Sequence, residues 1–208
     1  MSHDGIRPSL NTAGARDATE RPAAEVDDDF AGEEIARSHR LRLRGLRYAD
    51  IPELSRLYAC TTMQSMPGET PTRFIEVAAQ VARINRGYAE SPGLGVWRAD
   101  TLDGQFLGTF SLLPVADSDD VQVSVRLMPA MWGRWYAIEG GHLVCQRAFE
   151  VMRLTKLLGY CHRDLLPGHR VLTRFGFRDM GAEGDPSGLI HRYELDAVDW
   201  REARRLHT

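Results

Sequence analysis

His162 and Ser124 are the two side chains in the central part of the chain whose types best suit the movement of a proton. The imidazole of His162 changes charge near neutral pH, and it directly follows the apolar run 157–161. The Ser124 hydroxyl both donates and accepts hydrogen bonds, and it alternates with Val123 and Val125. Each residue also has a plainer interpretation. His162 can shape the turn after its strand, and Ser124 can be bonded within a sheet.

The segment that contains Ser124 also has the pattern of an anion-binding site. Apolar residues alternate over Val121–Leu127, which predicts a half-buried strand that ends before Pro129. A turn with Gly133 follows, and apolar residues then recur at helical spacing over 137–149. Because the first turn of a helix has free N–H groups and a positive dipole end, this strand, turn and helix predict a pyrophosphate site.

This segment resembles the coenzyme A segment of the GNAT family, the general-control-related N-acetyltransferases, most closely the branch of ribosomal-protein N-terminal acetyltransferases. The residues that agree with the branch pattern are Leu127, Pro129, Trp132, Gly133, Tyr136, Ala137 and Glu139, with Arg134 in place of a lysine. A second pattern of the branch follows downstream, at His162, Asp164, Arg170, Val171, Leu172, Gly176 and Phe177. Two matches in the right order are more specific than either match alone.

The resemblance implies an α/β (α+β) fold with a mixed, mostly antiparallel sheet of about seven strands and helices on both faces. It also implies an acetyl-CoA-dependent N-acetyltransferase that acts on a primary amine of a small molecule or of a peptide N-terminus. His162 would lie near the thioester and Ser124 near the acceptor. The residues expected to bind the coenzyme are Val125, Leu127, Trp132, Gly133, Arg134, Trp135, Tyr136, Ala137, Gly168, His169 and Arg170.

Four departures from the family pattern affect the expected site. Trp135 replaces the second turn glycine, Leu165 an asparagine and Gly168 a serine. Leu172 stands where the wider family has the tyrosine that protonates the leaving thiolate. Two alternatives therefore stay open. One is an acyl-CoA-binding relative that has lost catalysis and serves as a sensor or subunit, and the other is a transferase with a larger acyl donor.

Three charged residues of the matching segments also have ordinary explanations. Arg134 either adds charge beside the pyrophosphate or is a solvated loop arginine. Arg170 either meets coenzyme phosphates or pairs with a surface carboxylate. Glu139 matches a family position, but a glutamate in the first turn of a helix is also favoured by the dipole.

Length and composition limit the class of protein. The 208 residues suit one domain, and the net charge of −3 argues against a nucleic-acid-binding surface. The three cysteines lack the spacing of a disulfide framework or zinc site, so we expect no metal. No apolar run reaches the ~18 residues of a membrane span, and the N-terminus has no signal-peptide pattern. We expect a cytoplasmic protein with an amine acceptor as partner, and we leave a homodimer open.

The domain is expected to span 38–208 and to follow a disordered tail, 1–37. The tail is polar and nearly free of aromatic residues, so it buries too little surface to offset its ordering entropy. We expect it to be dispensable for folding. The alternative is that the segment 28–35 folds onto a partner or onto the domain.

The elements that must position the site follow from periodicity and turn signals. The predicted strands are 41–46, 94–99, 106–115, 121–127, 157–162 and 190–195. The predicted helices begin at Asp50 and at Thr70-Pro71, and others cover 137–149, 167–175 and 199–206. Thr61 to Glu69 is predicted to be a loop that helps to cover the acceptor in the resembling family, and 184–188 a turn.

Overall fold

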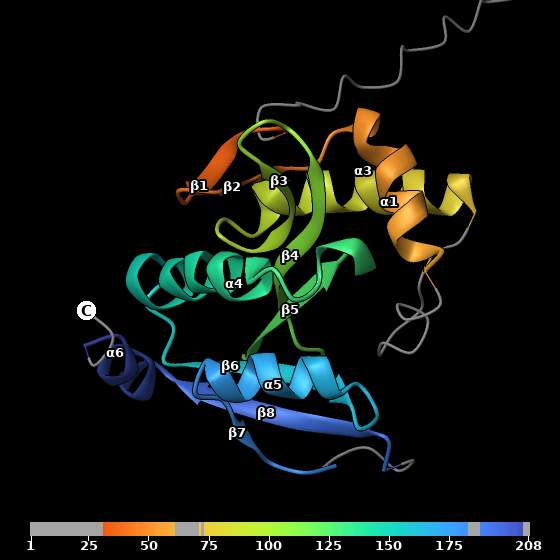
Figure 1. The fold of residues 1–208 in the computed structure, drawn as a ribbon. Coiled ribbons are helices and arrows are strands. Elements are labelled where there is room, and N and C mark those ends of the chain that lie inside the picture. Colours follow the sequence, from red (N-terminus) through yellow and green to blue (C-terminus); the bar gives the residue numbers. More distant parts are fainter. Residues whose placement is uncertain (1–30, 61–70, 72, 183–187, 206–208) are drawn as a thin grey trace, which may run out of the picture.

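The computed structural model describes residues 31–60, 71, 73–182 and 188–205, which form one eight-stranded sheet with helices on both faces (Figure 1). The strands are β1 (Glu34–Arg37), β2 (Leu41–Gly45), β3 (Gly95–Thr101), β4 (Phe106–Pro114), β5 (Val121–Leu127), β6 (Lys156–His162), β7 (Arg178–Asp179) and β8 (Ile190–Asp196). The α-helices are α1 (Ile51–Tyr58), α3 (Phe74–Glu90), α4 (Tyr136–Gln146), α5 (Leu166–Arg174) and α6 (Ala197–Arg205). Short 3-10 turns cover Tyr48–Asp50 and Pro129–Met131.

The sheet consists of two antiparallel parts that meet along β5 and β6. Its strand order is β1-β2-β3-β4-β5-β6-β8-β7, and the β5–β6 pair is its parallel step. The two strands pair at one position, Gln122 with Leu158, whereas β4 and β5 pair from Pro114 with Val121 to Gly108 with Leu127. The expected mixed, mostly antiparallel sheet is confirmed. It has eight strands in the described residues, rather than about seven.

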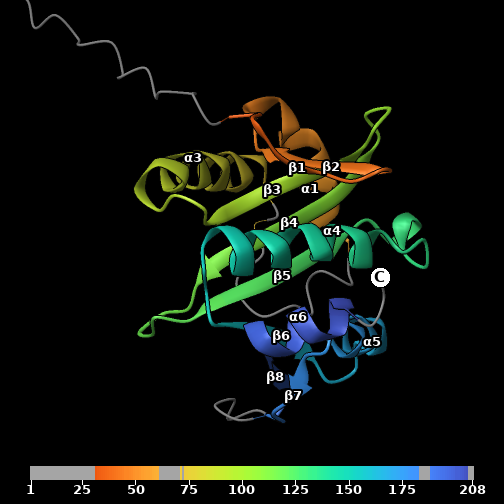
Figure 2. The ribbon, with the colours of Figure 1, turned by 90° about the vertical axis from the view of Figure 1, so that its left-hand side faces the viewer.

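Helices cover both faces of the sheet, and apolar side chains pack beneath them on each face. α4 lies across one face of the central strands, and α1 and α3 lie across the other (Figures 1 and 2). On the α4 side, Phe110 and Leu127 are buried with Val144 and Phe149. On the other side, Leu46 from the end of the β2 segment packs with Leu54, Leu57, Val77 and Val81 of α1 and α3. Each face therefore has its own hydrophobic cluster.

A buried ionic cluster joins α1 to β2 and β3. The carboxylate of Asp50, which is 4% exposed, lies 2.8 Å from Arg44 and 3.0 Å from Arg98. Arg98 also pairs with Asp100 at 2.6 Å, and the Asp50 carboxylate accepts the Arg47 backbone N–H at 2.8 Å. Buried charges are costly unless they are paired and hydrogen-bonded, and here each charge has such partners. The cluster fixes the entry of α1 onto the sheet.

Several boundaries differ from the predictions, and three of these differences concern β1, α3 and α4. Residues 34–37, assigned above to the tail, form β1, because their backbone pairs with β2 and because Ile35 and Ala36 pack against the core. α3 begins at Phe74 rather than at Pro71, where the carboxylate of Glu76 accepts the Arg73 N–H at 3.1 Å. The helix predicted over 137–149 is α4, which continues as a π-helical turn, Arg147–Val151.

Several predicted features lie outside the described residues. These are most of the tail, the N-cap at Thr70, the loop 61–69 and most of the turn 184–188. Within the part of the chain that the structure describes, no helix combines the length and the apolar character that a membrane crossing requires.

The ionic cluster predicts that Asp50→Asn lowers the free energy of unfolding at pH 7 by about 2–4 kcal/mol, because both arginines lose a buried counter-charge. Burial alone would raise the pKa of Asp50, but hydrogen bonds from Arg44 and Arg47 and the charges of Arg44 and Arg98 outweigh it, so the pKa is lowered. The wild-type contribution is therefore complete above the unfolded pKa of about 3.9 and is lost as the pH falls through the folded value.

Urea unfolding between pH 7 and pH 3 measures both effects. The matched control is Asp119→Asn, which changes an exposed carboxylate in the β4–β5 loop. Equal stabilities of Asp50→Asn and Asp119→Asn at pH 7 would contradict the role given to the cluster.

The position of β1 predicts that a chain beginning at residue 38 melts about 3–8 °C lower than a chain beginning at residue 31, since Ile35 and Ala36 lose their packing and β2 loses its partner. Both chains keep Ser38 and the domain beyond it. Differential scanning calorimetry of the two chains measures the difference, and equal melting temperatures would show that β1 does not stabilise the domain.

Candidate functional site

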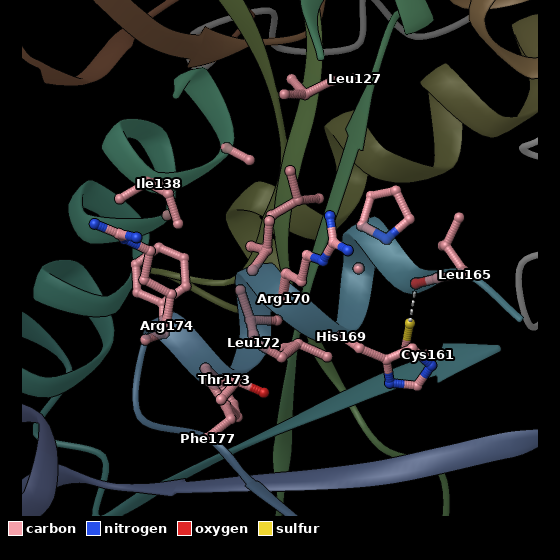
Figure 3. A pocket seen from close by; sticks show the side chains of 18 of the residues that line it. Leu127, Ile138, Cys161, Leu165, His169, Arg170, Leu172, Thr173, Arg174 and Phe177 are labelled. Carbon is pink, nitrogen blue, oxygen red and sulfur yellow. Dashed lines mark hydrogen bonds between the residues drawn. The ribbon is translucent and has the colours of Figure 1, made fainter. Parts of the chain in front are cut away.

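Two cavities lie beside the place where β5 and β6 separate. The larger has a volume of about 1060 Å³ and is lined by side chains of β5, α4, β6 and α5, several of which Figure 3 shows around it. The smaller has a volume of about 120 Å³ and is lined from the other face by Tyr58 of α1, Gln80 of α3 and the sheet. Val123, Ser124 and Tyr160 line both cavities. The two cavities, one on each face of the sheet, therefore adjoin at these three residues.

The backbone of β5 offers hydrogen-bond donors at this junction. Met128 donates its N–H to Leu107 of the β4 side. In a strand, successive N–H groups point to opposite neighbours, so the N–H groups of Leu127 and Val125 point toward β6. β6 pairs with β5 at Gln122, which lies three residues before Val125 and five before Leu127, so these two N–H groups face the gap. Val125 and Leu127, which the sequence predicted to bind the coenzyme, both line the larger cavity.

The turn before α4 has two residues in the left-handed region. Gly133 has φ +73°, which glycine adopts without strain, and its Cβ position is open. Trp135 has φ +68° and is the N-cap of α4. A left-handed conformation costs a non-glycine residue about 1 kcal/mol. Trp132 closes the turn, because its Nε1 donates to the Leu127 carbonyl at 3.0 Å.

The N-terminus of α4 is open to an anion. The first hydrogen bond of the helix runs from the Glu139 N–H to the Trp135 carbonyl, so the N–H groups of Tyr136, Ala137 and Ile138 precede it. The indole of Trp135 makes no capping hydrogen bond. These three residues line the larger cavity. The helix end therefore presents backbone donors and a positive dipole end to this space.

Contacts with the β1–β2 turn hold this helix end in place. The Arg40 guanidinium donates to the Glu139 carboxylate at 2.6 Å and to the Arg134 carbonyl at 3.2 Å. The Ser38 hydroxyl donates to the same carboxylate at 2.5 Å. Burial alone would raise the pKa of Glu139, but hydrogen bonds from Ser38 and Arg40 and the charge of Arg40 lower it. Glu139 is thus a positioning residue for the turn.

Of the neighbouring residues Arg134 and Trp135, only Trp135 lines the larger cavity. Arg134 is exposed and does not line either cavity, so the geometry does not support its predicted contact with a pyrophosphate. The indole of Trp135 is 54% exposed and lines the larger cavity. The guanidinium of Arg174 from α5 lies 4.3 Å from the centroid of the indole. This stack joins the N-terminus of α4 to the C-terminus of α5.

α5 contributes three of the predicted residues to the larger cavity. Gly168 allows close packing, because a Cβ there would lie 2.6 Å from the Cys161 sulfur. The ring nitrogens of His169 are engaged by the carbonyls of His162 and Arg163 and by the Tyr193 hydroxyl, so His169 holds the turn between β6 and α5. Arg170 is exposed at the cavity and is available to a phosphate.

His162 lies outside both cavities, so the structure does not support its predicted role in proton transfer. Its Nδ1 accepts the backbone N–H of Asp164 at 3.3 Å, and its carbonyl faces His169. The strand alternation explains this position. Tyr160 faces the junction, and His162, two residues further, lies at the end of β6 beyond the lining. The plainer interpretation, that His162 shapes the turn, fits these contacts.

The structure adds a residue that sequence analysis missed. Tyr160 lines both cavities, as Ser124 does. Leu172, at the position of the family tyrosine, also lines the larger cavity but has no group that transfers a proton. The sequence placed Tyr160 in a strand, but its nearness to Ser124 depends on the separation of β5 from β6.

Two cysteines line the larger cavity without acting as nucleophiles. Burial raises the pKa of Cys145 to about 12, and burial with the charge of Asp179 raises the pKa of Cys161 to about 11. Both thiols are therefore protonated at neutral pH, and a protonated thiol is a weak nucleophile. Among the described residues, no group of three or more histidine, cysteine or acidic side chains is arranged to hold a metal ion.

Comparisons with solved structures agree with this fold. An acetyltransferase from Agrobacterium tumefaciens is 20% identical, with 77% of this chain and 92% of that chain covered and a TM-score of 0.66. RimJ from Mycobacterium smegmatis, solved with CoA-disulfide, is 17% identical, with 80% and 87% covered and a TM-score of 0.63. A Vibrio cholerae protein assigned as a ribosomal-protein-serine acetyltransferase is 14% identical, with 79% and 97% covered and a TM-score of 0.64.

The family comparison covers most of the domain. The family model described as acetyltransferase (GNAT) domain matches residues 40–178, which span β2 to β7 and both cavities. This match confirms the resemblance found from the two sequence patterns. The chain belongs to the GNAT acetyltransferase family.

Proposed function

We propose that this chain is an acetyl-CoA-dependent N-acetyltransferase that acetylates a primary amine of a small molecule or of a peptide N-terminus. The observation that carries the proposal is the meeting of two cavities at Ser124 and Tyr160. A transferase must bring two substrates together with their reacting atoms in contact. Here a large cavity on the α4 face and a small one on the α1–α3 face share one junction.

The residues of the larger cavity fit a coenzyme with a pyrophosphate and a long apolar arm. The backbone donors at the start of α4 suit the pyrophosphate, and Arg170 suits a further phosphate. The β5 backbone that faces the gap can pair with the amide groups of an extended arm. When bound there, acetyl-CoA supplies an activated acyl group as a thioester. RimJ of M. smegmatis was solved with CoA-disulfide, which supports this assignment.

The side chains and backbone at the junction match what acetyl transfer requires. The amine loses a proton, its nitrogen forms a bond to the acetyl carbon, the carbon–sulfur bond breaks, and the sulfur gains a proton. The Val125 N–H points into the gap and can hydrogen-bond the carbonyl oxygen as negative charge develops on it. Tyr160 and Ser124 supply hydroxyl groups that can relay protons.

Tyr160 favours an active enzyme over a relative that has lost catalysis. The sequence departure at Leu172 removed the family acid, but Tyr160 supplies a hydroxyl at the junction. Turnover of acetyl-CoA with a panel of amines, followed by thiol release, tests this directly. Coenzyme binding without turnover of any amine would favour the sensor or subunit, and faster turnover of longer acyl-CoAs would favour a larger donor. The cytoplasmic location, the homodimer and the absence of metal, membrane and nucleic-acid partners stay predictions.

The turn before α4 predicts that Gly133→Glu weakens coenzyme A binding at least tenfold, about 1.4 kcal/mol. The new side chain would bring bulk and negative charge to the open space beside the α4 donors, and it would also strain a left-handed residue. Isothermal titration calorimetry measures the change.

Gly181→Glu is the matched control for this variant. Gly181 also has φ +73° with open space at its Cβ position, and it lies outside both cavities. The Gly181→Glu variant therefore introduces the same backbone strain and the same charge at a position away from the proposed coenzyme site. If the two variants bind coenzyme A equally well, the turn is not the pyrophosphate site.

The junction predicts that Tyr160→Phe lowers kcat about 100-fold at pH 7, because a hydroxyl that transfers a proton contributes on this order. His162→Ala should change kcat by less than ~3-fold, since a side chain outside both cavities makes no such contribution. Steady-state kinetics with a saturating amine compares the two. A larger loss for His162→Ala than for Tyr160→Phe would restore His162 as the candidate.

A further inference from the structure

The smaller cavity has a polar floor made by alternate residues of two strands. Thr109 and Ser111 of β4 pair in register with Arg126 and Ser124 of β5, so their side chains lie on one face. Gln122 continues this row. The opposite set, which includes Val125 and Leu127, packs toward α4. The floor of the cavity on the α1–α3 face is therefore made of hydrogen-bonding groups, whereas the α4 face of the same two strands is mainly apolar.

Among the described residues that line this cavity, Arg126 is the one with a charged side chain. It is half-buried, and its guanidinium carbon lies 5.7 Å from the centroid of the Tyr58 ring. Within the described ranges, no carboxylate forms an ion pair with it. Arg44 and Arg98, on the same side of the sheet, are held by Asp50 and Asp100 at 2.6–3.3 Å. Arg126 thus has a guanidinium whose counter-charge the described protein does not supply.

A buried hydrogen-bond acceptor of the cavity lacks a partner among the described residues. The Oε1 of Gln80 is inaccessible to solvent and accepts no hydrogen bond from any described residue. An unpaired buried acceptor costs about 1–3 kcal/mol, so a bound N–H donor would be favoured there. The cavity therefore offers a guanidinium for an anion and an amide oxygen for a donor such as an amine.

We infer that the acceptor is a small amine that carries a carboxylate, in the manner of a free amino acid. This inference rests on the proposed function and names its substrate class. A guanidinium matches the two oxygens of a carboxylate with two parallel hydrogen bonds. The volume of about 120 Å³ corresponds to a few water molecules of about 30 Å³ each, which suits a small head group.

The charge of Arg126 also distinguishes between acceptors. A purely cationic amine would meet that same charge without compensation. A carboxylate on the acceptor compensates it and positions the amine toward Ser124 and Tyr160, which line both cavities.

Matched substrate pairs test the inference with the full-length protein. Each of the common amino acids is compared with its own carboxamide, with acetyl-CoA saturating, and products are measured by mass spectrometry. The wild-type kcat/KM should be at least ~10-fold higher for the preferred amino acid than for its amide, as expected for a charge-assisted pair. Acetylation of amides or peptide N-termini as fast as of free amino acids would overturn the inference and leave the proposed function standing.

Substitutions of Arg126 show whether this residue makes the distinction. Arg126→Gln should raise KM for the amino acid about tenfold or more while the kinetics with the amide stay within ~3-fold. Arg126→Lys keeps the positive charge but loses the planar guanidinium. Its KM for the amino acid should lie between those of the wild type and Arg126→Gln. Arg86→Gln, which removes an exposed arginine from α3, is the matched control. Equal KM values in Arg126→Gln and Arg86→Gln would overturn the assignment.

A binding measurement keeps the inference testable if no amine is turned over. N-acetyl amino acids and their N-acetyl amides are titrated onto the protein by calorimetry, with circular dichroism to verify the fold of each variant. The inference requires that an N-acetyl amino acid binds and that Arg126→Gln abolishes its advantage over the amide. Failure to bind any such product would overturn the inference and leave the proposed function standing, whereas failure to bind acetyl-CoA would overturn the proposed function and the inference with it.

Discussion

The separation of β5 from β6 is the constraint on which the rest of the site depends. The two strands pair at Gln122 and Leu158 and then diverge, while β5 keeps its full ladder with β4 and β6 keeps its ladder with β8. Because each strand is held from its outer side, neither needs the other to stay extended. The gap leaves backbone groups of β5 unpaired in the interior of a sheet, where an unpaired group is costly unless something binds it. A cavity on each face opens onto this gap.

Long-range polar contacts keep both sides of the gap rigid. On the α4 face, Arg40 and Ser38 hold Glu139, so the helix end is tied to a turn about 100 residues earlier in the chain. On the other face, the cluster around Asp50 fixes α1 to β2 and β3. These contacts lie away from the reacting groups, yet they set the directions from which two substrates would approach one another. Positioning of this kind is a large part of what a transferase must provide.

Much of the fold could be predicted from sequence, because the strands alternate and the helices are amphipathic, and two motifs identified the family. β1 was missed because its four residues stand at the end of a polar segment and gain their order from pairing with β2. The turn before α4 could be predicted because its backbone geometry follows local residues. The sequence could not show that Tyr160 lines both cavities and His162 neither, because their distance from the junction depends on where two strands diverge. The sequence places Arg126 on the same strand face as Ser124, but only the structure shows that no described carboxylate lies beside it.

The position of Trp135 gives the molecule a built-in optical signal. The chain has four tryptophans, of which Trp97 and Trp200 are almost fully buried and Trp132 is hydrogen-bonded within its turn. Trp135 is 54% exposed, beside the α4 donors and against the guanidinium of Arg174. Its emission therefore belongs to a solvated, polar environment, while that of Trp97 and Trp200 belongs to an apolar one. Selective excitation of tryptophan in the presence of a soluble quencher would separate these populations and follow events at the mouth of the larger cavity without any label.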